Sequence, residues 1–157
     1  MRKNYRSTNP RTVRSPVPPD AIRDSIPGVL AHFTLAAHDV DATARFIERT
    51  LGYARKPLPP ESVGTAVWFD IGGGQEMHIL HVAEFEISPN EAEFGRHVAL
   101  FHPLADFAAL KARLADEGAV LIDPIRPTAY ERFFFREPVN GYVFEVIDQA
   151  RASHFDQ

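Results

Sequence analysis

The sequence contains no cysteine among its 157 residues. This absence excludes disulfides, thiolate nucleophiles and cysteine-ligated zinc or iron–sulfur sites. A tightly bound metal ion would therefore need histidine and carboxylate ligands. The chain also lacks an apolar run of about 18 residues, which a membrane helix needs, and an apolar signal segment behind Arg2 and Lys3. We expect a soluble, cytoplasmic protein without membrane contact.

The chain also lacks a net positive charge, because 21 Asp and Glu outnumber 17 Lys and Arg and give a formal net charge of −4. Proteins that bind nucleic acid neutralise phosphates with clustered Lys and Arg, so this charge argues against a nucleic-acid partner. The composition, 45% hydrophobic and 24% charged, is that of a globular protein. A chain of this length can bury one sizeable core but is short for two.

The first 28 residues differ from the rest of the sequence. They hold six of the 17 basic residues and five of the 13 prolines, with little apolar surface to bury. Such a segment cannot offset the entropy cost of ordering its backbone. We expect a flexible, basic, proline-rich arm over residues 1–28, one folded domain over 29–149, and a short tail over 150–157.

Within the folded domain, two segments share one order of elements, β-α-β-β-β. Residues 29–83 predict a strand at 29–37, a helix capped by Asp39 and ended by Gly52, and strands at 66–71 and 75–82, with a short strand possible between the helix and residue 66. Residues 95–149 predict strands at 97–101, 120–123, 131–135 and 142–147, and a helix over 105–117. The repeat indicates an α+β fold of two βαβββ modules, whose curved mixed sheets form one central cavity.

The same repeat places metal-competent side chains at matching positions. His32 and His97 lie near the start of each module's first strand, and His78 and Glu145 lie in each last strand. Burying an unpaired glutamate in an apolar strand costs several kcal/mol, so Glu145 needs a cationic partner. If the two sheets face each other, these four side chains meet. We predict that they bind one divalent metal ion.

Three imidazoles and one carboxylate suit Fe(II), Mn(II), Co(II), Ni(II) or Zn(II), with water in the open positions. Glu76 shares the strand face of His78 and is the alternative ligand there. Strand alternation puts Arg132 and Phe134 on one face, where, with Trp68, they would contact an anionic or carbonyl-bearing substrate. Core packing of the aromatic rings and a surface salt bridge of Arg132 are the competing interpretations.

Several segments resemble a known family. They are Ala31–Leu35, Asp39–Val40, Ala44–Ile47, Leu51–Tyr53, Trp68–His78, Gly95–Leu100 and Phe134–Pro138 through Glu145. Together they resemble the vicinal oxygen chelate superfamily, which includes glyoxalase I, extradiol dioxygenases, methylmalonyl-CoA epimerase and the fosfomycin and bleomycin resistance proteins. The resemblance covers about residues 29–149. It implies a pair of βαβββ modules, a homodimer, and a metal that substrate oxygens coordinate, with ligands at His32, His78, His97 and Glu145.

We therefore expect a metal-dependent enzyme that acts on a small oxygenated molecule. Glyoxalase-type lyase or isomerase chemistry, with Glu145 as the catalytic base, is favoured over ring-cleaving dioxygenase chemistry. Phe134 and Phe135 precede the Glu137–Pro138 turn, where extradiol dioxygenases usually carry a tyrosine. Ala36 stands where glyoxalase I has an arginine that helps to hold glutathione, which argues against that substrate. The alternative function is a non-catalytic protein of the bleomycin-resistance type that sequesters a small molecule.

Overall fold

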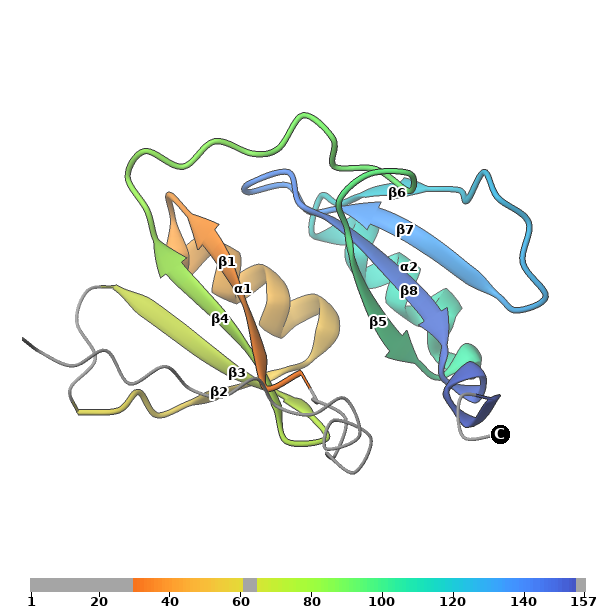
Figure 1. Ribbon diagram of the computed structural model, residues 1–157, viewed down its shortest axis with the longest axis horizontal. Helices are drawn as coiled ribbons and strands as arrows, with labels where there is room; N and C mark the ends of the chain where they lie inside the picture. The colour runs from red at the N-terminus through yellow and green to blue at the C-terminus, as the bar shows by residue number, and fades with distance from the viewer. Residues whose placement is uncertain (1–29, 61–64, 155–157) are drawn as a thin grey trace, which may run out of the picture.

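The computed structural model describes residues 30–60 and 65–154 and arranges them as two sheets with two helices (Figure 1). The expected arm over 1–28 and the last residues of the expected tail, 155–157, lie outside the described residues. The tail begins as a short 3-10 helix, η3 (Gln149–His154). Within the described residues, no helix is long and apolar enough to span a membrane.

The first module contains β1 (His32–Ala37), α1 (Val40–Leu51), β2 (Ala54–Lys56), β3 (Ala66–Gly72) and β4 (Gln75–His81). Its sheet has the strand order β1-β4-β3-β2, in which β1 is parallel to β4 and the other pairs are antiparallel. Helix α1 begins as predicted because the Asp39 carboxylate accepts a hydrogen bond from the Ala42 amide. It ends at Gly52, whose φ of 74° lies in the left-handed region that favours glycine.

The second module contains β5 (Val98–His102), η2 (Leu104–Asp106), α2 (Phe107–Asp116), β6 (Val120–Ile122), β7 (Arg132–Arg136) and β8 (Val143–Asp148). Its sheet order, β5-β8-β7-β6, repeats that of the first module, and β5 is parallel to β8. The helix predicted over 105–117 starts as the 3-10 turn η2, and α2 follows it without a side-chain cap from Asp106. The matching topologies confirm the predicted α+β fold of two modules.

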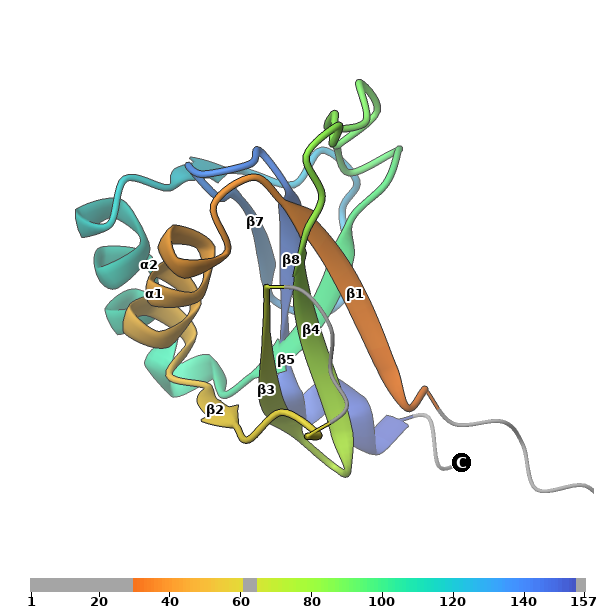
Figure 2. The same ribbon diagram turned by 90° about the vertical axis from the view of Figure 1, so that its left-hand side faces the viewer.

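Both helices lie on the same side of the two sheets (Figure 2). Alternate strand residues face these helices and are buried in a shared core: Leu35, Ala37, Val67, Phe69, Met77, Ile79, Phe133, Phe135, Phe144 and Val146. The ring of Phe46 on α1 contacts that of Phe135 on β7, so the core is continuous between the modules. The other face of each sheet points away from the helices, and we call it the open face.

The two modules are joined at the outer edge of β1. The Tyr142 hydroxyl donates a hydrogen bond to the Ala36 carbonyl and accepts one from the Ala36 amide, both at 3.0 Å. Burial raises the pKa of Tyr142, which keeps the hydroxyl protonated. A second link runs from the Asn140 side-chain amide to the Thr43 hydroxyl at 2.9 Å. Polar contacts from one short segment therefore help to hold the second module against the first, together with the Arg113–Thr50 hydrogen bond between the helices.

That segment is shaped by a buried carboxylate. Glu137 is 1% exposed and accepts hydrogen bonds from the amides of Val139, Asn140 and Tyr142. These bonds hold the turn between β7 and β8 and set the position of Tyr142. The contact between the modules thus depends on a local turn as well as on the apolar core.

Replacing Tyr142 with Phe should lower the free energy of unfolding by about 1–3 kcal/mol, because two partly buried backbone groups of Ala36 lose their partner. Urea denaturation at pH 7 measures the change. Tyr53→Phe is the matched control, since the Tyr53 hydroxyl has no hydrogen bond to the part of the chain that the structure describes. Equal stability of the two variants would contradict the role given to Tyr142.

Candidate metal centre

The open face of the first sheet carries a stack of three rings. Trp68 and His78 are partners in the β3–β4 register, and their ring centroids lie 4.1 Å apart with an interplanar angle of 6°. The His32 ring stacks on the opposite face of the His78 ring, with the centroids 4.3 Å apart and an interplanar angle of 13°. The structure thus brings His32 and His78 into contact, and we call this pair the first half-site.

A carboxylate fixes the orientation of one of these imidazoles. Glu76 Oε2 lies 2.8 Å from His78 Nε2, and Glu76 also pairs with Lys56. The hydrogen bond from Lys56, followed by that from His78, holds the pKa of Glu76 below its ordinary value. Since the carboxylate can only accept, His78 Nε2 carries the proton and Nδ1 of the neutral ring keeps a lone pair. Metal-binding histidines commonly donate their other N–H to such a partner.

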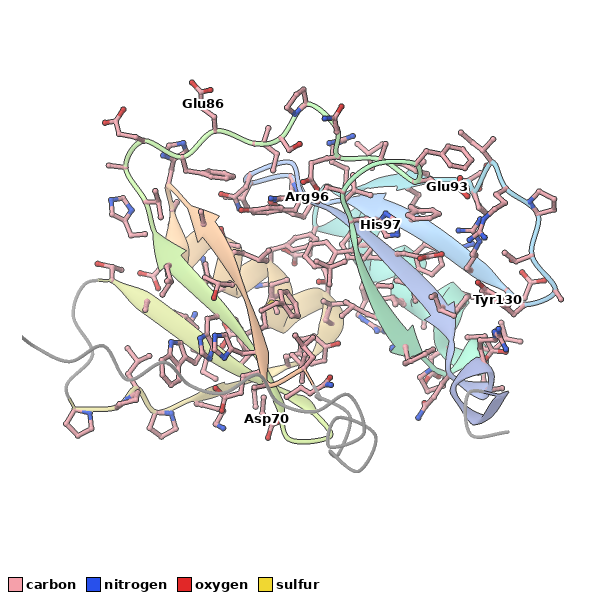
Figure 3. All side chains as sticks on the ribbon, in the orientation of Figure 1. Asp70, Glu86, Glu93, Arg96, His97 and Tyr130 are labelled. Carbon is pink, nitrogen blue, oxygen red and sulfur yellow. The ribbon has the colours of Figure 1, made fainter. Side chains whose placement is uncertain are left out.

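The second half-site is the pair His97 and Glu145 on the open face of the second sheet (Figure 3 labels His97). His97 Nε2 lies 3.3 Å from Glu145 Oε2, while His97 Nδ1 donates to the Ala92 carbonyl at 3.2 Å. The Phe134 ring packs edge-on against His97 at 5.4 Å. With Nδ1 donating, a neutral His97 would point a lone pair at a carboxylate oxygen. That contact is favourable only with a cation, either a proton or a metal ion, between the two atoms.

Arg132 binds the other oxygen of Glu145. Its Nη1 donates to Glu145 Oε1 at 2.7 Å, and its Nη2 donates to the Arg126 carbonyl at 2.6 Å and to Glu93. The Arg132 side chain is 1% exposed. Burial by itself would lower the pKa of Arg132, but the hydrogen bonds with Glu145 and Glu93 outweigh it and raise the pKa. The guanidinium expected to meet substrate is thus engaged with protein groups.

The two half-sites do not meet within one chain. Among residues 30–60 and 65–154, no group of three or more His, Cys, Asp or Glu side chains is placed to hold a metal ion. The reason is the arrangement of the sheets. They lie side by side with both open faces directed away from the helices, and therefore do not face each other (Figure 2).

The chemical types of the donor atoms nevertheless suit a divalent transition metal. Each half-site has two candidate ligands in contact, and each has one nitrogen whose neighbour fixes the ring tautomer. Three imidazoles and one carboxylate match the ligand preferences of Mn(II), Fe(II), Co(II), Ni(II) and Zn(II). Each half alone supplies two ligands, fewer than such ions take from a protein when tightly bound.

The sequence analysis did not single out Glu93, which lies in the connector between the two modules, residues 82–97. The signal was present in Arg132, because an arginine on the same strand face as a buried glutamate leaves spare donors that need a further acceptor. Which acidic residue of the connector meets it depends on the path of residues 82–97, which no local pattern determines.

Comparison with known proteins agrees with this fold. The family model described as "Glyoxalase/Bleomycin resistance protein/Dioxygenase superfamily" matches residues 29–146. The fosfomycin resistance protein FosX from Mesorhizobium loti is 19% identical with a TM-score of 0.59, over 83% of this chain and 99% of that one. A FosX variant from Listeria monocytogenes, complexed with Mn(II) and 1S,2S-dihydroxypropylphosphonic acid, is 19% identical with a TM-score of 0.60, over 78% and 90%.

The structure described as oxidase ChaP-H2 is 24% identical with a TM-score of 0.59, over 78% of this chain and 94% of that one. At these identities the three likenesses show a shared fold and nothing finer. No curated protein matches the sequence. The family model spans well over half of the 157 residues, and the chain therefore belongs to the Glyoxalase/Bleomycin resistance protein/Dioxygenase superfamily, the vicinal oxygen chelate superfamily that its sequence resembles.

Proposed function

We propose that this protein is a metal-dependent enzyme acting on a small oxygenated molecule, and that its metal centre is shared between two chains. One chain would supply His32 and His78, and the other would supply His97 and Glu145. The observation that carries this proposal is the pairing of the candidate ligands. Each module holds two of them in contact, on an open face, at positions that correspond in the duplicated fold.

A homodimer would complete the centre. Because both open faces point to the same side of the molecule (Figure 2), a second copy related by a twofold axis can lay its second half-site over the first half-site of this chain. The symmetry then builds two equal centres per dimer. The Mn(II) bound in the FosX structure from Listeria monocytogenes supports a divalent metal in this fold.

The side chains of the two half-sites suggest a division of roles. A bound divalent ion would supply Lewis-acid stabilisation of negative charge on substrate oxygens. Glu145 would bind the ion through Oε2, since Arg132 occupies Oε1, and would act as general base through the same oxygen when it is transiently released from the ion. Trp68 and Phe134 would form apolar walls around the substrate.

Among the reactions of this superfamily, we favour lyase or isomerase chemistry of the glyoxalase type, with ring-cleaving dioxygenase chemistry second. The position of Glu145 supports this order, because a carboxylate with one oxygen held and the other facing His97 is suited to moving a proton. The hydroxyl of Tyr142, which is committed to Ala36, is not available as an acid at this face.

The fluorescence of Trp68, the single tryptophan of the chain, should report metal binding. Co(II) at His78 would lie next to the stacked indole and quench it, so we expect saturable quenching at one ion per chain. His97→Ala should weaken this binding by at least about tenfold although His97 is on the other sheet, because a ligand of the same ion is lost.

His81→Ala is the matched control for this titration, since it removes a histidine from β4 without touching either half-site, and it should behave as wild type. Unchanged quenching in His97→Ala would contradict a shared centre. Binding of a small molecule with no Co(II) binding at all would favour the sequestering protein over the enzyme.

Mixing two defective chains should restore metal binding. His78→Ala and Glu145→Gln each damage both centres of their own dimers. In a mixed dimer one centre receives both damaged half-sites and the other receives two intact ones. Random pairing should therefore recover about a quarter of the wild-type metal content per chain. Metal analysis after co-expression and dialysis measures this content, and no recovery would place the whole centre within one chain.

A further inference from the structure

We propose that Arg132 is a positioning residue for Glu145, and that Glu93 holds Arg132 in place, so that a connector between the modules becomes part of the metal centre. This inference rests on the proposed function. It concerns three side chains that come from different parts of the sequence: Glu93 from the connector, Arg132 from β7 and Glu145 from β8.

The geometry directs one oxygen of Glu145 away from any metal ion. Arg132 Nη1 binds Oε1 at 2.7 Å, and the only oxygen left beside His97 Nε2 is Oε2, at 3.3 Å. The Glu145 side chain is 8% exposed and lies opposite Phe134 in the β7–β8 register, so it has little room to turn. Arg132 therefore presents Glu145 as a ligand through Oε2.

Arg132 is itself held by groups that do not touch the half-site. Glu93 pairs with Nη2, and the Arg126 carbonyl accepts from the same nitrogen at 2.6 Å. The Glu93 carboxylate also accepts hydrogen bonds from the amides of Ile125 and Arg126. These bonds attach the loop before β7 to the connector. Loss of Glu93 would release the loop and the guanidinium together.

The charges of this cluster explain why two carboxylates are needed. Glu145 and Arg132 alone would form a neutral pair, in which the guanidinium reduces the attraction of Glu145 for a metal ion. Glu93 adds a second negative charge on the far side of Arg132, so the buried cluster keeps a net charge of −1. Burial by itself would raise the pKa of Glu93, but the hydrogen bonds from the Ile125 amide, Arg132 and the Arg126 amide outweigh it and hold the pKa below its ordinary value.

Positioning and simple charge repulsion predict opposite results for Arg132→Met. If Arg132 only repels a metal ion, its removal leaves a cluster with charge −2 and Co(II) binds more tightly. If Arg132 positions Glu145, its removal frees the carboxylate and Co(II) binds more weakly. Mutation of a residue that hydrogen-bonds to a metal ligand typically reduces the affinity for the metal by about 10- to 100-fold.

The test is a Co(II) titration of the full chain monitored by visible absorption. The absorption spectrum reports the number and geometry of the ligands as well as the affinity. We expect Arg132→Met to weaken Co(II) binding by about 10- to 100-fold and to change the absorption spectrum of the bound ion. Glu93→Gln, which keeps the shape of the side chain and is less disruptive, should weaken binding by about tenfold. Arg132→Lys should recover part of the loss.

Glu91→Gln is the matched control. Glu91 is the other buried connector carboxylate, and it pairs with Arg96 and the Val143 amide without touching Arg132 or Glu145. This variant should bind Co(II) within about twofold of wild type. An equal loss in Glu91→Gln and Glu93→Gln would overturn the inference, because any damage to the connector would then suffice.

Two further outcomes distinguish a failure of this inference from a failure of the proposed function on which it rests. Wild-type or tighter Co(II) binding in Arg132→Met, or an unchanged affinity in Glu93→Gln, overturns the positioning role and leaves the metal centre standing. Absence of Co(II) binding in the wild-type chain overturns the proposed function and the inference with it. Thermal unfolding of each apo variant identifies any that has lost its fold, in which case the Glu93→Gln result decides.

Discussion

The structure depends on how a buried carboxylate in an apolar strand is compensated. Glu145 is 6% exposed and lies between Phe144 and Val146, whose side chains face the core. An unpaired charge there would cost several kcal/mol. Arg132 satisfies one oxygen of Glu145, and the other faces His97. The fold therefore leaves one position beside Glu145 where a further cation is favourable, and the proposed chemistry follows from that position.

In the duplicated topology, the residues that form the core and the candidate metal ligands lie on opposite faces of the same sheets. In both modules one face of the sheet packs against a helix, and the alternate residues of the same strands form the open face. Ligand candidates can therefore lie on short strands without weakening the core. The junction between the modules uses polar contacts of Tyr142 with Ala36 and of Asn140 with Thr43, none of which is a candidate ligand. Such a junction fixes the two open faces relative to each other while leaving them free for a partner.

Much of this fold could be predicted from local patterns in the sequence. The cap at Asp39, the stop at Gly52 and the repeated order of strands are local signals, and the structure follows them. The open faces were also predictable, since alternation placed Arg132 and Phe134 on one face. The relative placement of the two sheets was not, because it depends on contacts between residues as distant as Ala36 and Tyr142. The role of Glu93 likewise depends on a long connector whose path no periodicity describes.

The most direct test of the shared metal centre is a crystal structure of the Mn(II)-loaded protein with anomalous scattering measured at the manganese edge. The account predicts one strong anomalous peak per chain, within about 2.0–2.3 Å of nitrogen atoms of His32, His78 and His97 and of Glu145 Oε2, a range typical of metal–ligand bonds. The first two residues would come from one chain and the last two from its partner. A peak bound by one half-site alone, or by other residues, would contradict it.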